Sequence, residues 1–161
     1  MPHQCAMTYR ITGLDPVRFA DLYGASDLDL QEHGAVRMTV TARPGFPCRI
    51  TLDDAAPGET VLLVNHLSVP RGPYRASHAI FVREGALTPA TFQDEMPRAL
   101  QSRILSLRAF DRQDMMVDAA LVQPGEGDAT VRRLFDNLAV AYIHTHNATR
   151  GCFDAAIERA T

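Results

Sequence analysis

The sequence predicts an α+β domain, with a mostly antiparallel sheet and about three short helices packed to one side. Two observations predict this class. Segments with the features of strands follow one another along the chain with few helical segments between them, which is the order expected of antiparallel pairing. Three other segments begin with a residue that favours the N-terminus of a helix. The length of 161 residues fits one domain of ordinary size.

The first quarter of the chain is predicted to contain a short strand and two helices. Residues 9–14 form the strand, and residues 1–8 before it are expected to be a flexible tail, which leaves 9–161 as the globular domain. Asp15 and Pro16 then favour a helix start, since Asp caps helices and Pro fits their first position, and Gly24 is a fitting stop. Ser26 caps a second helix over residues 27–33.

The middle of the chain is predicted to be strands. Residues 35–41 alternate between aliphatic and polar side chains, the period-two pattern of a half-buried strand. Two prolines within residues 44–47 interrupt this pattern, because proline cannot donate to a sheet ladder. Further strands are expected over residues 49–52, 60–65 and 77–83, and over the hairpin formed by 103–110 and 115–122.

The last third is predicted to contain one helix and two strands. Asp128 caps the helix, and apolar residues recur at helical spacing at Val131, Leu134, Phe135 and Leu138. Strands are expected over residues 140–146 and 151–158.

Charge and composition exclude several classes of protein. All 16 basic residues are arginine, against 19 acidic residues, which gives a formal charge of −3. A general nucleic-acid binder would need a basic balance, so no nucleic-acid partner is expected. No apolar run approaches the roughly 20 residues that span a bilayer, so no membrane partner is expected either. Because lysine is absent, Schiff-base chemistry is excluded.

The N-terminus lacks the basic start and apolar run of a secretory signal, so the protein is expected to be cytoplasmic. Its three cysteines, Cys5, Cys48 and Cys152, are then expected to be reduced thiols. Glycine-rich phosphate loops, the Cys-x-x-Cys motif, nucleophile elbows and the His-Glu-x-x-His motif are all absent from the sequence. No cofactor is therefore expected, and whether the protein is an enzyme is left open.

The densest group of polar residues lies in residues 142–153. If residues 140–146 form a strand, His144 and His146 share one face roughly 7 Å apart, and Asn147 and Arg150 follow in a polar turn. Three interpretations of the histidine pair stay open: a hydrogen-bonded structural role, a metal-free polar site, or two ligands of a metal ion. Zinc needs a third and usually a fourth ligand, and no spacing supplies them, so no metal is assigned.

Cysteine and arginine residues add further candidates. Cys152 lies close to Arg150 in the sequence, and Cys48 is next to Arg49. A nearby cation lowers the pKa of a thiol, which would make either cysteine more reactive. Both thiols also suit a structural role in a core. Arg75 and Arg108 also lie in motif-like segments, and a guanidinium holds a carboxylate or phosphate with two hydrogen bonds. The alternative for each arginine is a salt bridge to a neighbouring acidic residue, of which Asp111, Asp118, Asp53 and Glu59 are available.

Four motifs occur in order along the chain, and together they resemble one known family. They are Pro-Gly-Phe-Pro-Cys-Arg at 44–49, Tyr-Arg-Ala-Ser-His-Ala-Ile-Phe-Val-Arg at 74–83, Arg-Ala-Phe-Asp at 108–111, and His-Asn at 146–147 with Arg-Gly-Cys-Phe at 150–153. The sequence resembles, from residue 9 onward, the uncharacterised bacterial family called domain of unknown function 1203. The resemblance implies a small stand-alone bacterial protein and carries no activity or site residue.

Three hypotheses of function follow from the sequence. The first is a site for a small anionic molecule, binding or catalytic, with His144 or His146 as the general base if a reaction occurs. The second is a non-enzymatic protein–protein interaction module, with a homodimer left open, and the third is a metal-binding protein that uses the His-x-His pair. The first hypothesis requires side chains from several strands to meet at one accessible place: His144, His146 and Cys152 as catalytic candidates, and Arg75, His78, Arg108, Asn147, Arg150, Cys48 and Arg49 as ligand-binding candidates.

Overall fold

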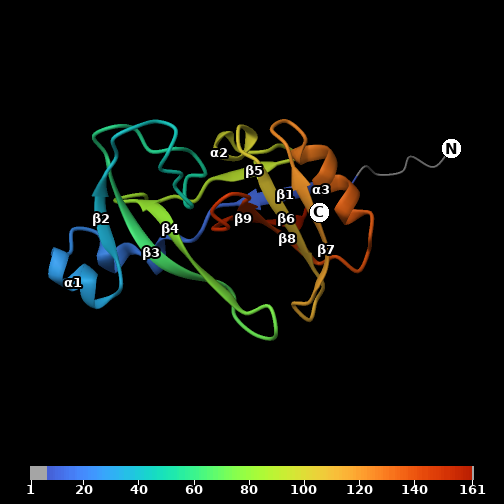
Figure 1. The fold of residues 1–161 in the computed structure, drawn as a ribbon, viewed down its shortest axis with the longest axis horizontal. Helices are drawn as coiled ribbons and strands as arrows, with labels where there is room; N and C mark the ends of the chain where they lie inside the picture. Colours follow the sequence, from blue (N-terminus) through green and yellow to red (C-terminus); the bar gives the residue numbers. More distant parts are fainter. Residues whose placement is uncertain (1–6, 161) are drawn as a thin grey trace.

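Two antiparallel sheets, one of six strands and one of three, build the protein, and three α-helices accompany them (Figure 1). The structure is a computed structural model, and it describes residues 7–160. The predicted α+β class is confirmed. No helix among the described residues is long and apolar enough to cross a membrane.

The larger sheet has the strand order β5-β1-β9-β8-β6-β7. Its central strands, β8 and β9, come from the last twenty residues of the chain, and the first strand of the chain pairs with the last. Its members are β1 (Tyr9–Thr12), β5 (Thr91–Gln93), β6 (Leu105–Phe110), β7 (Met116–Val122), β8 (Tyr142–Asn147) and β9 (Phe153–Arg159).

The smaller sheet has the order β2-β3-β4 and is dominated by one long hairpin. Its members are β2 (Val36–Thr39), β3 (Thr60–Val69) and β4 (Ala76–Arg83). The aliphatic residues of β3 and β4 that point toward the larger sheet are buried, among them Val64, Ile80 and Val82. This hairpin is what brings residues of the middle of the chain to the larger sheet.

The helices are short, as the sequence predicts. They are α1 (Asp27–Glu32), α2 (Arg98–Gln101) and α3 (Gly127–Phe135). The side chain of Ser26 accepts a hydrogen bond from the amide of Asp29, so the predicted cap of α1 is confirmed. Helix α3 buries Val131, Leu134 and Phe135 against the larger sheet.

Two hydrophobic cores lie on the two faces of the larger sheet. One core joins alternate residues of β6, β8 and β9, such as Leu107 and Ile143, to helices α2 and α3. The other joins Phe153, on the opposite face, to β3 and β4 of the smaller sheet. Gly13 lies between the two cores, where a Cβ atom would come within 1.9 Å of the carbonyl oxygen of Ile50. Only glycine allows this close contact between the backbones.

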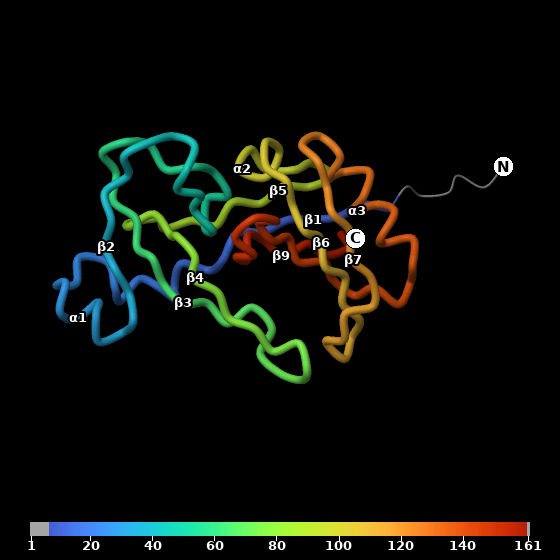
Figure 2. Tube along the Cα trace, viewed as in Figure 1, coloured from blue at the N-terminus to red at the C-terminus, as the bar shows by residue number. Residues whose placement is uncertain are grey.

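The tips of two hairpins meet on one side of the molecule, where both point downward in the view of Figure 1. The connection between β3 and β4 carries Arg71, whose Nε atom donates to a carboxylate oxygen of Asp114 at 2.7 Å, in the turn between β6 and β7. The ring of Tyr74 also contacts that of Phe110, with ring centres 6.1 Å apart. The chain trace in Figure 2 shows how far the β3–β4 hairpin extends from its own sheet.

Several predicted elements were wrong in detail. Residues 16–24 form two 3-10 helices, Pro16–Arg18 and Ala20–Leu22, because the segment lacks the continuous apolar face that an α-helix buries, and Val17 is largely exposed. Residues 49–52 form a turn, closed by a hydrogen bond from the amide of Leu52 to the carbonyl of Cys48. Strand β5 and helix α2 were not predicted, because they are too short to show a periodicity.

The predicted start and end of the third helix were also wrong. Asp128 lies inside α3 and does not cap it, because its carboxylate accepts hydrogen bonds from the hydroxyl of Tyr9 and from Arg132. Leu138 lies beyond the helix and is 88% exposed. The helix therefore presents a shorter apolar face than the spacing suggests.

Candidate functional site

Four histidines from two hairpins meet on the face of the larger sheet that the β3–β4 hairpin covers. His66 and His78 lie directly opposite each other on β3 and β4, and His144 and His146 lie on β8. The ring centres of His78 and His146 are 4.9 Å apart, and those of His144 and His146 are 6.2 Å apart. These four residues are called the histidine cluster below.

Strand periodicity explains why the cluster forms. Side chains two residues apart on a strand point the same way, so His144 and His146 both face the hairpin, while Ile143 faces helix α3. The ring of Phe153 fills the space among the imidazoles, with ring centres 5.2 Å from His66 and 5.0 Å from His144. The cluster is therefore a packed contact between the two sheets, with little water around its rings.

Burial keeps these histidines uncharged. Desolvation lowers the pKa of His66 and of His144 to about 4, and that of His146 to about 3. It also lowers the pKa of His78, which is half-buried. At neutral pH each imidazole then carries one proton and offers one donor and one acceptor nitrogen.

Two of the imidazole nitrogens are buried without a hydrogen-bond partner in the described structure. They are Nδ1 of His78 and Nδ1 of His144. The corresponding atom of His146 contacts the carbonyl oxygen of Gly151 at 2.9 Å, which fixes that ring. A buried polar atom that lacks a partner costs about 1–3 kcal/mol. A polar group of a ligand that reached either free nitrogen would recover part of this cost.

Besides Arg18, whose charge contributes to the lowered pKa of His66, Arg108 is a cation close to the histidine cluster. It lies opposite His144 on the neighbouring strand β6, and its charge contributes to the lowered pKa values of His78, His144 and His146. Its Nε atom donates a long hydrogen bond, 3.4 Å, to the hydroxyl of Ser106.

Arg108 differs from the other half-buried arginines of residues 7–160. Each of those holds a carboxylate or a backbone carbonyl, whereas Arg108 holds neither. The nearby carboxylate of Asp114 is already engaged by Arg71 and by the hydroxyl of Tyr142. Uncharged imidazoles and the guanidinium of Arg108 therefore lie together, and the nearby carboxylate of Asp114 is engaged elsewhere, an environment that favours an anion.

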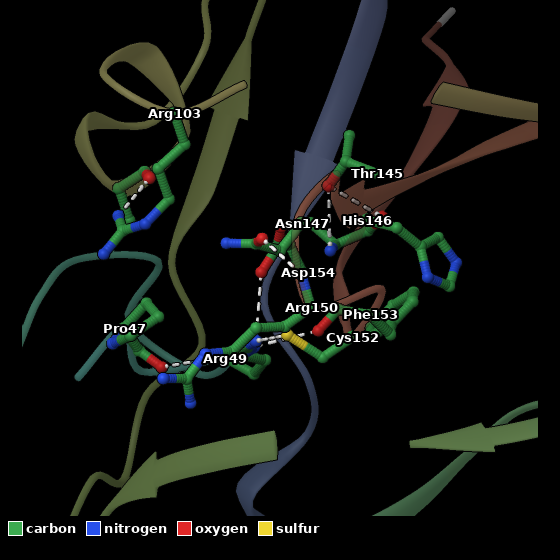
Figure 3. A network of polar contacts seen from close by, with 12 residues as sticks. Pro47, Arg49, Arg103, Thr145, His146, Asn147, Arg150, Cys152, Phe153 and Asp154 are labelled. Atoms are coloured by element: carbon green, nitrogen blue, oxygen red, sulfur yellow. Dashed lines mark hydrogen bonds and ion pairs between the residues drawn. The ribbon is translucent and has the colours of Figure 1, made fainter. Parts of the chain in front are cut away.

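A second polar group lies at the start of β9 and is built around Arg49 (Figure 3). The guanidinium of Arg49 contacts a carboxylate oxygen of Asp154 at 3.0 Å, the sulfur of Cys152 at 3.2 Å and the carbonyl of Phe153 at 2.9 Å. Arg49 and Asp154 are both buried. Because its donors are engaged within the protein, Arg49 ties the turn at 47–49 to strand β9.

The structure thus divides the candidate residues into groups. His78, His144, His146 and Arg108 meet in the first group, and Arg49 and Cys152 meet in the second. Cys48 is buried in the core between the sheets, where its sulfur accepts from the amide of Arg83 at 3.2 Å.

The remaining candidates lie outside both groups. Arg75 is exposed in the connection between β3 and β4. Asn147 closes the turn between β8 and β9, since its side-chain oxygen accepts from the amides of Thr149 and Arg150. Arg150 itself is exposed.

Sequence reasoning missed His66 and Ser106. The predicted strand over 60–65 stops one residue before His66, whereas β3 continues to Val69. Continuing the alternation through residue 69 would have placed His66 on the buried face with Val64. Strand β6 places the hydroxyl of Ser106 beside the guanidinium of Arg108, in the position opposite His146.

No group of three or more His, Cys, Asp or Glu side chains within residues 7–160 is arranged to hold a metal ion. A surface pocket of about 410 Å³ lies between α2 and the start of α3, and another of about 360 Å³ lies beside Asp53 and Arg83. Both lie away from the histidine cluster.

Comparison with known proteins gives one result. No curated protein and no solved structure matches this chain. The family model described as "Protein of unknown function (DUF1203)" matches residues 45–159. The matched range includes both polar groups, whereas β1, α1 and β2 precede it. The match covers most of the chain, and the chain therefore belongs to the DUF1203 family.

Proposed function

We propose that this protein binds a small anionic molecule where the β3–β4 hairpin meets the larger sheet, and that Arg108 anchors the anion. The observation that carries the proposal is a half-buried guanidinium without a carboxylate or carbonyl partner in residues 7–160, beside uncharged imidazoles. A guanidinium binds carboxylate or phosphate with two hydrogen bonds, and a neutral imidazole can donate a third.

The neighbours of Arg108 suit this role. Ser106 offers a hydroxyl on the same strand and the same face, and His78 reaches the site from the hairpin. The pKa values of His144 and His146, about 4 and 3, make both rings weak proton acceptors at neutral pH. An efficient general base has a pKa near the working pH, so the geometry supports binding more directly than it supports a proton-transfer reaction.

The proposal is tested by titrating the protein with acetate and with inorganic phosphate while NMR follows the Arg side-chain Nε–H signals and the His ring signals. Wild-type protein is expected to show saturable shifts at Arg108 and His78. Arg108→Gln is expected to weaken binding at least about tenfold, because a hydrogen bond to a charged group contributes about 1.5–3 kcal/mol.

Arg10→Gln is the matched control. It removes the same charge from an exposed strand residue for which no ion pair is found among the described residues, and it should leave binding unchanged. Absence of saturable binding by the wild type, or equal binding by Arg108→Gln, would refute the proposal.

A further inference from the structure

The face of the larger sheet that carries Arg108 changes from buried to open across neighbouring strands. Cross-strand pairing places Ala119, Arg108 and His144 in one row on β7, β6 and β8. The next row holds Leu121, Ser106 and His146. Residues paired in this way share a face of the sheet.

Burial falls steadily along both rows. His144 and His146 are 5% and 2% exposed beneath the hairpin. Arg108 and Ser106 are half-buried, and on β7 Ala119 is exposed and Leu121 is 66% exposed. The β3–β4 hairpin thus covers β8 and leaves β7 open, with Arg108 at the boundary.

We infer that the ligand of this site is an amphiphilic carboxylate, whose charged end meets Arg108 and whose hydrocarbon body lies across Ala119 and Leu121 on β7. This inference rests on the proposed function and adds the chemical class of the ligand. The side chains next to Arg108 toward the buried side are packed rings, so a ligand held by this guanidinium extends toward the open side.

The residues on the open side match a hydrocarbon. Ala119 lies directly opposite Arg108, and its small side chain leaves space above the sheet beside the guanidinium. Leu121 lies opposite Ser106 and borders that space with an apolar side chain. Strand β7 is the last strand of its sheet, so no further strand among the described residues crowds this side. Neighbouring strands are about 4.8 Å apart, so a chain of about four to six carbons reaches from Arg108 across β7.

The test measures the affinity for acetate, butyrate and hexanoate, which carry the same charge on chains of increasing length. Affinity in the wild type is expected to rise about twofold for each added methylene, since a methylene covered on one side gains about half of the transfer free energy of full burial. Leu121→Ser is expected to reduce this increase strongly while acetate binding stays as in the wild type.

Leu138→Ser is the matched control, because Leu138 is 88% exposed beyond helix α3 and the same change there should keep the full dependence on chain length. Equal affinity for acetate and hexanoate, or an undiminished increase in Leu121→Ser, would overturn the amphiphilic ligand and leave anion binding standing. Failure of all three carboxylates and of phosphate to bind would instead remove the proposed function.

A second copy of the chain is the other occupant that could cover Leu121. Light scattering on the same samples separates the two cases, since the inference predicts that Leu121→Ser leaves the oligomeric state unchanged. A wild-type dimer that Leu121→Ser dissociates, with no dependence of affinity on chain length, would assign this face to self-association and overturn the inference.

Discussion

At the scale of single residues, Arg49 and Asp154 form an ion pair that joins the turn at 47–49 to strand β9. Both side chains are buried, and burial raises the pKa of Asp154 to about 6 although the Arg49 guanidinium lies 3.0 Å away. Removing one partner of a buried pair leaves an uncompensated charge, which usually costs 3–5 kcal/mol. Arg49→Met is therefore expected to lower the free energy of unfolding by about that amount at pH 8.

The loss in Arg49→Met should be smaller at pH 5. Without Arg49 the pKa of Asp154 rises further above its unfolded value, so folding takes up a proton, and stability increases as the pH falls through the folded pKa. Denaturant unfolding at both pH values, compared with the wild type at the same pH, measures this difference. Arg43→Met breaks a half-exposed pair with Asp53 and should cost less than about 1 kcal/mol at either pH. An equal loss at pH 5 and pH 8 in Arg49→Met would contradict the account.

The sequence indicates Arg49 and Cys152 as residues of interest but not their pairing. A salt bridge was an open alternative for each arginine, with Asp53 among the partners considered for it. The structure instead pairs Arg49 with Asp154, which follows it by more than a hundred residues. Such a contact depends on how two distant turns are brought together, and no local pattern of residues contains that information.

At the scale of elements, the contact between the two hairpin tips holds the β3–β4 hairpin over the larger sheet. Asp114 accepts hydrogen bonds from Arg71 and from the hydroxyl of Tyr142, both at 2.7 Å. Arg71 is 70% exposed, so solvent screens its ion pair with Asp114, and the hydrogen bond from Tyr142 contributes about 1 kcal/mol. Asp114→Ala should therefore open the hairpin tip more often without unfolding the protein.

Trypsin measures this opening, because the tip contains two cleavable sites, after Arg71 and after Arg75. Cleavage at these sites is expected to be about five- to tenfold faster in Asp114→Ala, since proteolysis follows the population of the open form. Asp118→Ala removes a carboxylate from the exposed strand β7, where it contacts only a neighbouring amide among the described residues, and should leave the rate unchanged. Similar cleavage rates in both variants would show that the Asp114 contact does not restrain the tip.

Period-two patterns in the sequence predict most strands but not their ends. The pattern gives the hairpin of β6 and β7 and the common face of His144 and His146, which are properties of one element or of two adjacent ones. It misses the last residues of β3, and with them His66, because a polar residue on a buried face breaks the alternation from which strands are recognised. The end of β3 is therefore missed at the position where a polar residue enters the site.

At the scale of the whole molecule, the arrangement of the two sheets decides which residues meet. The α+β class is predicted by the order of elements, but the strand order β5-β1-β9-β8-β6-β7 is not, because many pairings of short strands bury similar apolar area. Only this order, with the β3–β4 hairpin folded over β8 and β9, brings His66 and His78 to His144 and His146. The candidate site is a consequence of the packing of the two sheets.

The same packing makes the stability of the whole protein depend on pH between about 6.5 and 4. Burial lowers the pKa of His66 and His144 to about 4 and that of His146 to about 3, whereas the unfolded chain takes up protons at all three near pH 6.5. The unfolded state then binds more protons in this interval, so stability falls with falling pH by up to about 1.4 kcal/mol per pH unit for each imidazole. Asp154 acts in the opposite direction below pH 6, so the net fall is smaller than the sum over the three imidazoles.

Denaturant unfolding at half-unit steps from pH 7.5 to pH 5 measures this slope, and a few kcal/mol per pH unit is large against a total stability of about 5–15 kcal/mol. His144→Gln replaces a buried imidazole with a side chain that does not titrate, so it should reduce the slope by about 1.4 kcal/mol per pH unit, whatever its effect on stability at pH 7.5. An unchanged slope in His144→Gln would show that His144 takes up its proton in the folded protein as it does in the unfolded chain, which is the reverse of what its packing implies.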